Sequence, residues 1–178
     1  MKKTKLFTVL SPLVVALAAC VTAPPATTTV TVHAITAEGV GKPIGTIRAE
    51  DGNDGLLLTV ALMGLAPGDH GFHVHENPSC APKEKDGKPV AGLAAGGHYD
   101  PAKTGKHAGP KAHGHLGDLP ALSVDASGNA NARLVAPRLK LADLKGRSIM
   151  IHEGGDNYAD SPKPLGGGGG RIACGVTP

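Results

Sequence analysis

Short apolar runs alternate with long polar, Gly-rich stretches along the whole chain. The segment "TTTVTVHAI" (27–35) places Val30 and Val32 on one side, which is the period of a half-buried strand. Residues 43–65 predict two strands around "EDGNDG", a sequence with the residues that hairpin turns favour. The same kinds of pattern predict further strands within 68–76, a hairpin that turns at "DASGN" within 121–137, and short strands within 147–155 and 171–176.

Two long stretches, roughly 77–120 and 153–170, show no periodic apolar pattern and are full of Gly and Pro. Residues 141–146 favour a single helical turn, and we find no internal repeat. Short strands joined by Gly/Pro-rich turns predict an all-β sandwich or barrel. Loops as long as these two, without regular structure, are usually either functional or disordered.

The composition agrees with this all-β prediction and limits what the core and the partners can be. The chain has 178 residues, which suits one domain, and its 26 Gly and 15 Pro agree with many turns. With two Phe, two Tyr and no Trp, the core has to consist of Val, Leu, Ile and Ala. Lys2, Lys3 and Lys5 account for the whole excess of 18 basic over 15 acidic residues. We see no basic stripe with stacking aromatics, so we expect no nucleic-acid partner.

The first 19 residues are typical of an export signal. A basic start precedes an apolar stretch over 6–19, which is too short to span a membrane. The sequence "LAAC" resembles the lipobox of bacterial lipoproteins and predicts cleavage before Cys20 with acylation of that residue. The alternative is an ordinary signal peptide cut near Ala19. Residues 20–29 then predict a flexible tether, and the expected location is the periplasm, attached to a membrane by lipid. Val21 replaces the aspartate that retains some lipoproteins in the inner membrane, which favours the outer membrane.

Export also bears on the other two cysteines. If Cys20 is acylated, Cys80 and Cys174 remain in an oxidising compartment, where they can form a disulfide. The alternative is a pair of buried free thiols. A disulfide would tie the loop after "GFHVHE" to the last predicted strand.

The histidines are strongly clustered, with seven of nine between residues 70 and 115. His73 and His75 share one face of a predicted strand, and His152 directly follows an apolar run at 149–151. These three bring nitrogen ligands, which suit copper and zinc.

A second group of possible ligands lies on a Gly-rich loop. It contains His107, His115 and Asp118, and nitrogen ligands with one carboxylate suit tetrahedral zinc. His98 lies between the two groups in sequence, and its two ring nitrogens could join two metals.

Taken together, "GFHVHE", "GGHYDP", "KHAGPKAHGHLGDLP" and "IHEGGDNYADSPKPLGGGGGRIACGV" resemble bacterial copper,zinc superoxide dismutase of the periplasmic type. The resemblance runs from about residue 30 to the end, so residues 30–178 are expected to form the superoxide dismutase domain. It implies a Greek-key, Ig-like β-sandwich or barrel with a long metal-binding loop and a long electrostatic loop. The implied reaction converts superoxide to oxygen and hydrogen peroxide by alternate reduction and oxidation of copper, with zinc in a structural role.

The resemblance also implies a role for each matching residue. His98 would bridge the metals, leave copper on reduction and supply a proton. Arg171 would orient the superoxide anion, Asp156 would accept hydrogen bonds from one ligand of each metal, and Cys80–Cys174 would be a disulfide. The copper ligands would be His73, His75, His98 and His152, and the zinc ligands would be His98, His107, His115 and Asp118.

Some predictions remain open at this stage. His33, His70 and His113 are interpreted as surface residues, and Lys83, Lys85, Lys88 and Lys163 as candidates for steering superoxide. Other classes to weigh are an exported metal-binding or trafficking protein without turnover and an Ig-like adhesion domain. The protein could be a monomer or a homodimer.

Overall fold

The computed structural model describes residues 26–178. The predictions for the signal peptide, for Cys20 and for most of the tether therefore lie outside the described residues. Within 26–178 no helix is long and apolar enough to cross a membrane. The described elements are the strands β1 (Thr27–Thr36), β2 (Gly39–Gly52), β3 (Gly55–Met63), β4 (Gly68–His70), β5 (Phe72–His75), β6 (Lys83–Lys85), β7 (Lys88–Val90), β8 (Leu122–Val124), β9 (Asn129–Ala136), β10 (Ser148–His152) and β11 (Arg171–Val176), and the short 3-10 helices η1 (Leu93–Ala95), η2 (Leu141–Leu144) and η3 (Leu165–Gly167).

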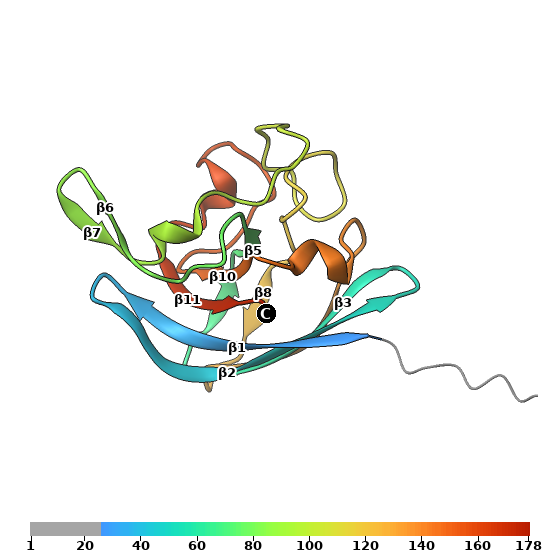
Figure 1. The fold of residues 1–178 in the computed structure, drawn as a ribbon, viewed down its shortest axis with the longest axis horizontal. Coiled ribbons are helices and arrows are strands. Elements are labelled where there is room, and N and C mark those ends of the chain that lie inside the picture. Colours follow the sequence, from blue (N-terminus) through green and yellow to red (C-terminus); the bar gives the residue numbers. More distant parts are fainter. Residues whose placement is uncertain (1–25) are drawn as a thin grey trace, which may run out of the picture.

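Seven of these strands form one curled antiparallel sheet in the order β5-β10-β11-β1-β2-β3-β9. β4 and β8 pair in a separate two-stranded sheet, and β6 and β7 form another. Neighbours such as β5 and β10, or β11 and β1, are far apart in sequence, as a Greek-key connection requires. In Figure 1 the long β1, β2 and β3 form the curved wall on one side, and the long loops gather on the opposite side. The all-β prediction is confirmed.

The alternation of side chains in β5 and β10 decides what faces the core and what faces the loops. Phe72 and Val74 of β5 belong to the main buried cluster, together with Ile149 and Ile151 of β10. The intervening residues therefore point to the other face of the same wall. Met150 belongs there to a small cluster with both cysteines of the disulfide, and the histidines of β5 lie on that face too.

The predicted strand within 68–76 is in fact two strands. The strand is interrupted at Gly71, so that β4 pairs with β8 whereas β5 pairs with β10. A side chain at Gly71 would lie 3.1 Å from Cε1 of His73 and 3.3 Å from Cβ of His152. The glycine therefore lets the backbone change sheets while two histidines approach it closely.

The predicted hairpin within 121–137 is confirmed only at its turn. Asp125 N–H donates to the Asn129 carbonyl at 2.8 Å, which closes the turn. The flanking strands then separate, since β8 pairs with β4 and β9 pairs with β3. The pattern of apolar and polar residues could not identify the strands that pair with β8 and β9, because each of them lies more than 50 residues away in sequence.

A third difference is the β6–β7 hairpin inside the stretch that we expected to be irregular. It turns at Asp86 and Gly87, whose φ angles of 53° and 73° are those that a tight hairpin turn needs. It projects from one side of the molecule in Figure 1. Its strands are exposed and charged, so no apolar alternation marked them in the sequence.

Candidate metal centre

The wall formed by β5 and β10 brings three histidines together. Met150 pairs with His73 and Ser148 pairs with His75 in the register of the two strands, and His152 ends β10. All three side chains are buried, with exposures of 6% or less, beneath the loops. His98 joins them through an isolated bridge to His75. One ligand atom from each of the four lies within 4.8 Å of the others, close enough for a single ion to contact all four.

In three of these rings one nitrogen makes a hydrogen bond to a neighbouring oxygen. His73 Nε2 donates to Asp156 Oδ2 at 2.8 Å, and His75 Nδ1 donates to the Gly96 carbonyl at 3.0 Å. His152 Nδ1 donates more weakly, at 3.3 Å, to the Gly169 carbonyl. Such bonds fix the tautomer and leave a lone pair on the other nitrogen, as metal-binding histidines require. The two free nitrogens of His75 and His152 lie 3.4 Å apart.

The acidity of this group agrees with a role as neutral ligands. Burial lowers the pKa of His98 to about 4 and that of His152 to about 3. Burial also holds the pKa of His75 well below its usual range and lowers that of His73. Neutral imidazole is the form that binds a metal, so these rings need not lose a proton near pH 7.

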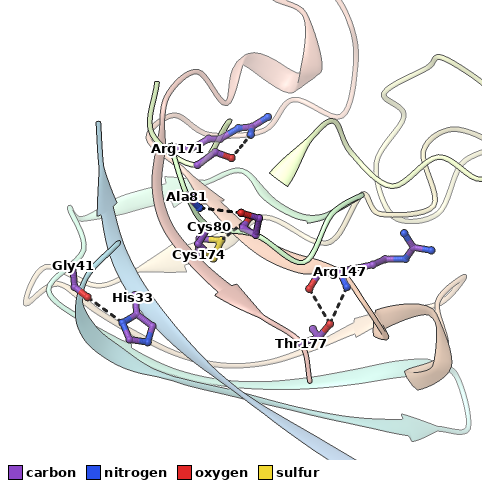
Figure 2. The surroundings of a disulfide bond; sticks show 10 residues. His33, Gly41, Cys80, Ala81, Arg147, Arg171, Cys174 and Thr177 are labelled. Carbon is purple, nitrogen blue, oxygen red and sulfur yellow. Dashed lines mark hydrogen bonds between the residues drawn. A yellow bond between two sulfur atoms is a disulfide. The ribbon is translucent and has the colours of Figure 1, made fainter. Parts of the chain in front are cut away.

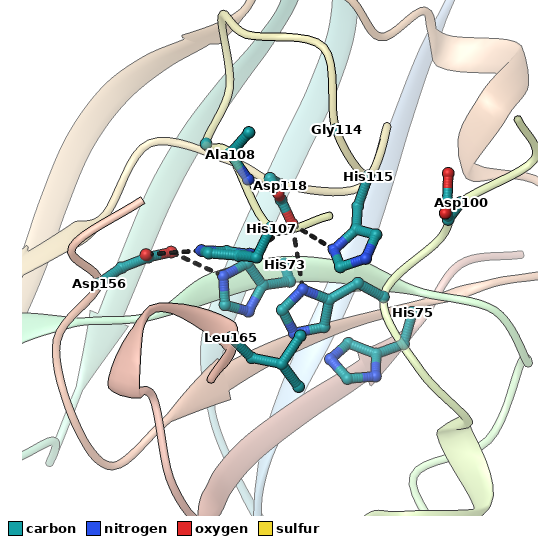
Figure 3. A network of polar contacts seen from close by, with 12 residues as sticks. His73, His75, Asp100, His107, Ala108, Gly114, His115, Asp118, Asp156 and Leu165 are labelled. Carbon is teal, nitrogen blue, oxygen red and sulfur yellow. Dashed lines mark hydrogen bonds and ion pairs between the residues drawn. The ribbon is translucent and has the colours of Figure 1, made fainter. Parts of the chain in front are cut away.

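A second set of ligand atoms converges on one carboxylate oxygen. The Nδ1 atoms of three histidines lie near Asp118 Oδ1: that of His98 at 3.0 Å, that of His107 at 3.1 Å and that of His115 at 3.4 Å. Figure 3 shows Asp118 facing His107 and His115. Tetrahedral zinc, with bonds of about 2.0–2.1 Å, places its ligand atoms roughly 3.3–3.4 Å apart. The observed spacing therefore suits a tetrahedral zinc site.

Distance alone would also place His73 in this second set. His73, His98, His107 and Asp118 have ligand atoms within 4.8 Å of one another, whereas His115 falls outside that group. His73 has only Nδ1 free, however, so it can serve only one set, and its place on β5 puts it on the same face as His75. The buried Nδ1 atom of His115 lies 3.4 Å from Asp118 Oδ1, so His115 suits the second set better.

Unpartnered nitrogens support this division of the rings. Four of the five buried side-chain polar atoms without a hydrogen-bond partner within residues 26–178 are histidine nitrogens of these two sets. Leaving a buried polar atom unpartnered is costly, so each such atom needs an explanation, and a bound metal ion is one. They are His73 Nδ1, His98 Nε2, His107 Nδ1 and His115 Nδ1. His98 is the one ring with a nitrogen directed at each set.

Asp156 connects the two sets from the side opposite His98. Its Oδ2 accepts from His73 Nε2 at 2.8 Å and its Oδ1 accepts from His107 Nε2 at 2.7 Å, as Figure 3 shows. Burial alone would raise the pKa of Asp156, but its hydrogen bonds to the two histidines hold that pKa well below its usual range. For His107, burial is outweighed by Asp118 and Asp156 on either side, which raise its pKa to about 9.

A glycine is required beside this carboxylate. A side chain at Gly166 would lie 2.0 Å from Asp156 Oδ1 and 2.8 Å from His107 Nε2, and its φ is +71°. The backbone of the late loop can therefore close over the Asp156–His107 hydrogen bond only where no Cβ is present.

Arg171 lies beside the four-histidine set, at the first position of β11. It pairs with His152 in the register of β10 and β11. Its guanidinium donates to the carbonyls of Gly92 at 2.6 Å and Gly96 at 2.7 Å. Its charge helps to lower the pKa of both His75 and His152, after the larger effect of burial. The structure thus places a half-buried, fixed cation next to the nitrogen ligands.

The predicted disulfide is confirmed. Cys80 and Cys174 are bonded, with their Cα atoms 5.6 Å apart and a sequence separation of 94. Figure 2 shows the bond joining the loop segment before Ala81 to β11, the strand that begins at Arg171. The same loop continues to the two glycine carbonyls that hold Arg171, so the disulfide limits how far this loop can move from β11.

The remaining candidate residues divide into two groups. His113 and the four candidate lysines are exposed, as expected, and His33 is half-buried with Nδ1 3.0 Å from the Gly41 carbonyl. The surface prediction for His70 is wrong, because this residue is 2% exposed and its nitrogens contact the carbonyls of His152 and Ala66. Sequence reasoning also missed the carbonyls of Gly96 and Gly169 that orient His75 and His152.

The fold and the site define an all-β protein with two adjoining, histidine-rich metal sites that share one ring. Comparison with known proteins agrees: residues 44–177 match the copper/zinc superoxide dismutase (SODC) family. The chain belongs to this family.

Individual relatives are close over most of the chain. The "Superoxide dismutase [Cu-Zn]" of Brucella abortus is 57% identical over 150 residues, which cover 84% of this chain and 87% of that protein. The solved structure of the Brucella abortus enzyme superposes with a TM-score of 0.84 at 56% identity, covering 85% of this chain and 99% of the other. The solution structure of the monomeric enzyme from Salmonella enterica gives a TM-score of 0.78 at 54% identity, covering 86% and 100%.

Family membership confirms the predicted activity and cofactors. The protein is an oxidoreductase that converts superoxide to oxygen and hydrogen peroxide, and its cofactors are copper and zinc. The interpretations as an adhesion domain or as a metal carrier without turnover are therefore set aside.

Proposed function

We propose that the four-histidine set binds copper and the set around Asp118 binds zinc, with His98 as their shared ligand. The observation that carries this assignment is the use of the ring nitrogens. His73, His75 and His152 each have one nitrogen engaged and one free, whereas His98 directs one nitrogen to each set. Four imidazoles suit copper, and three imidazoles with one carboxylate suit zinc.

The shared ring provides a direct test. If His98 bridges, adding zinc to copper-loaded protein changes the electron paramagnetic resonance spectrum of copper(II), and a His98→Ala variant loses that response. His113→Ala is the matched control, since His113 is exposed on the same loop. A copper spectrum in the unmodified protein that does not respond to zinc would contradict the bridge.

Copper supplies the one-electron redox chemistry, and zinc, which has no accessible redox step, supplies charge and order. The residues around them have to bind an anion and provide protons. We propose that His98 carries a proton on Nε2 whenever that atom does not bind metal, while its Nδ1 stays beside Asp118. The 3.0 Å contact between His98 Nδ1 and Asp118 Oδ1 supports this, because it holds the ring in place while Nε2 changes partner.

Arg171 is proposed to bind and orient superoxide. Two of its donors are used on the carbonyls of Gly92 and Gly96, which fixes the guanidinium without neutralising it. A small anion that approaches the nitrogens of His75 and His152 meets this positive charge. Arginine suits the role because its planar fork can hold backbone carbonyls and an anion together.

We also propose that the mature protein is a periplasmic lipoprotein on the outer membrane, joined by residues 20–29 to the enzyme domain 30–178. The support is the leader with "LAAC" before Val21. In a Gram-negative host, mass spectrometry should find acyl chains on Cys20, and Cys20→Ser should release the protein from the membrane fraction. Unmodified Cys20 would contradict the proposal. Gel filtration of the domain distinguishes a homodimer from a monomer like the Salmonella enterica relative.

A further inference from the structure

Arg138 donates hydrogen bonds to the loop that carries the second set of ligands. It lies two residues after the end of β9, and its side chain is half-buried. The guanidinium donates from Nε to the Pro110 carbonyl at 3.0 Å and from Nη1 to the Gly114 carbonyl at 3.2 Å. Nη2 donates to the carbonyls of Gly109, at 3.3 Å, and of His115. Four carbonyl oxygens thus converge on one cation.

All four carbonyls belong to residues 109–115, between the ligands His107 and Asp118. Across residues 26–178, the carbonyls of Gly109, Pro110 and Gly114 receive no hydrogen bond from any group other than Arg138. Four carbonyl dipoles pointing at one spot would repel one another without a positive charge between them. The loop can therefore keep this shape only while a donor with several N–H groups occupies its centre.

Other hydrogen bonds of this loop are made near its candidate ligands, and the Tyr158 ring packs against Gly109. His115 N–H donates to the Lys106 carbonyl at 2.8 Å, and Ala108 N–H donates to Asp118 Oδ2 at 3.2 Å. The segment between them has no strand or helix. Within residues 109–114, the hydrogen bonds to backbone carbonyls come from Arg138, which follows the edge strand β9.

We propose that Arg138 is a positioning residue for zinc: it shapes the 107–118 loop before the metal arrives and so raises the affinity for zinc. Ordering a flexible segment opposes binding, because its conformational entropy is lost at that moment. With Arg138 in place, most of that ordering occurs when the protein folds. The direct bond to the His115 carbonyl makes this ligand the one most affected.

The inference rests on the proposed assignment of zinc to this loop, and it concerns the affinity for zinc more than the affinity for copper. The nitrogens of His73, His75 and His152 are oriented by Asp156 and by the carbonyls of Gly96 and Gly169, none of which touches Arg138. Removing Arg138 should therefore alter the ratio of the two affinities. A general loss of structure would weaken both metals equally.

The test compares Arg138→Met and Arg138→Lys with the control Arg133→Met. Arg133 is exposed on β9, and no hydrogen bond from its side chain occurs within the described chain. Zinc affinity is measured by competition with a chromophoric chelator, copper affinity is measured in parallel, and cobalt(II) reports the geometry of the zinc site. We expect the Kd for zinc to rise about 10–100-fold in Arg138→Met, the range typical of residues that orient metal ligands. Lysine, a single-point donor, should restore only part of this loss.

Two results would overturn the inference: a zinc Kd in Arg138→Met equal to that of Arg133→Met, or an equal loss of affinity for both metals. If Arg138→Met does not fold, Arg138→Lys provides the same comparison. A His115→Ala variant tests the underlying zinc assignment separately. If the cobalt(II) spectrum of the unmodified protein is not tetrahedral, or does not change in His115→Ala, that assignment fails. If it does change but the Arg138 variants match the control, only the role of Arg138 fails.

Discussion

The two sets of ligands are built in different ways. Three members of the four-histidine set stand on β5 and β10, where strand register and a packed core fix their positions. The set around Asp118 comes from a loop without regular structure between η1 and β8. Strand register positions the strand-borne histidines, whereas the loop-borne set depends on side-chain contacts, with Arg138 and with Asp156, which also contacts His73 of the wall. Rigid elements hold a site more accurately than loops do.

This structural difference matches the different roles expected of the two metals. The metal that changes oxidation state is expected on the rigid wall, where strand register holds three of the four histidines. The metal without redox chemistry is expected in the loop, where its binding energy can help to order the chain. His98 joins both regions, since it lies in the loop after η1 and forms a backbone bridge with His75 of the wall.

The largest expected effect comes from breaking the strand-borne set alone. His75→Ala removes a proposed copper ligand that contacts neither Asp118 nor Asp156, so the protein should lose copper binding and retain zinc. The rate of superoxide consumption should fall by more than roughly 100-fold, beyond the range for residues that only orient ligands. Metal analysis and a superoxide assay on the purified domain measure both quantities. Equal loss of zinc would contradict the separation of the two regions.

Asp156→Asn should affect both regions at once. The amide keeps the shape of the carboxylate but cannot accept from His73 and His107 on both sides. We expect the affinities for copper and for zinc each to fall about 10–100-fold. Asp125→Asn is the matched control, because Asp125 accepts backbone hydrogen bonds in a turn outside both sets. A loss confined to one metal would mean that Asp156 serves that site alone.

The strand-borne region was also the more predictable from sequence. Period-two alternation placed His73 and His75 on one face, and an apolar run placed His152 at the end of a buried strand. In the loop, the residue types on one Gly-rich stretch suggested His107, His115 and Asp118 as zinc ligands. No local pattern could fix their geometry or assign His98 to both sets, because loop geometry depends on tertiary contacts; the full assignment there relied on family resemblance. The hydrogen bonds of Arg138 to backbone carbonyls and the burial of His70 escaped prediction for the same reason. Such contacts are made across the fold and leave no spacing in the sequence.

Arg171→Lys should separate anion binding from metal binding. Lysine keeps the positive charge but cannot hold the carbonyls of Gly92 and Gly96 with a fork, so the charge should move away from the copper site. We expect the second-order rate with superoxide to fall about 10-fold, the lower end of the range for electrostatic attraction in a cleft. The content of copper and zinc should not change. A fall in metal content would mean that Arg171 supports the wall instead of the substrate.

The smallest effect should come from the exposed hairpin β6–β7, which belongs to neither region. Lys83, Lys85 and Lys88 are exposed there, and the negative charges of Glu84 and Asp86 lie among them. Replacing the three lysines by glutamine should lower the rate less than roughly threefold at low ionic strength, and salt should remove the difference because exposed charges are screened. Stopped-flow rates over a range of ionic strength measure this, with Lys145→Gln as the control at an exposed site outside this hairpin. A variant whose rate differs from the unmodified protein equally at all ionic strengths would show that the lysines act through structure and not through their field.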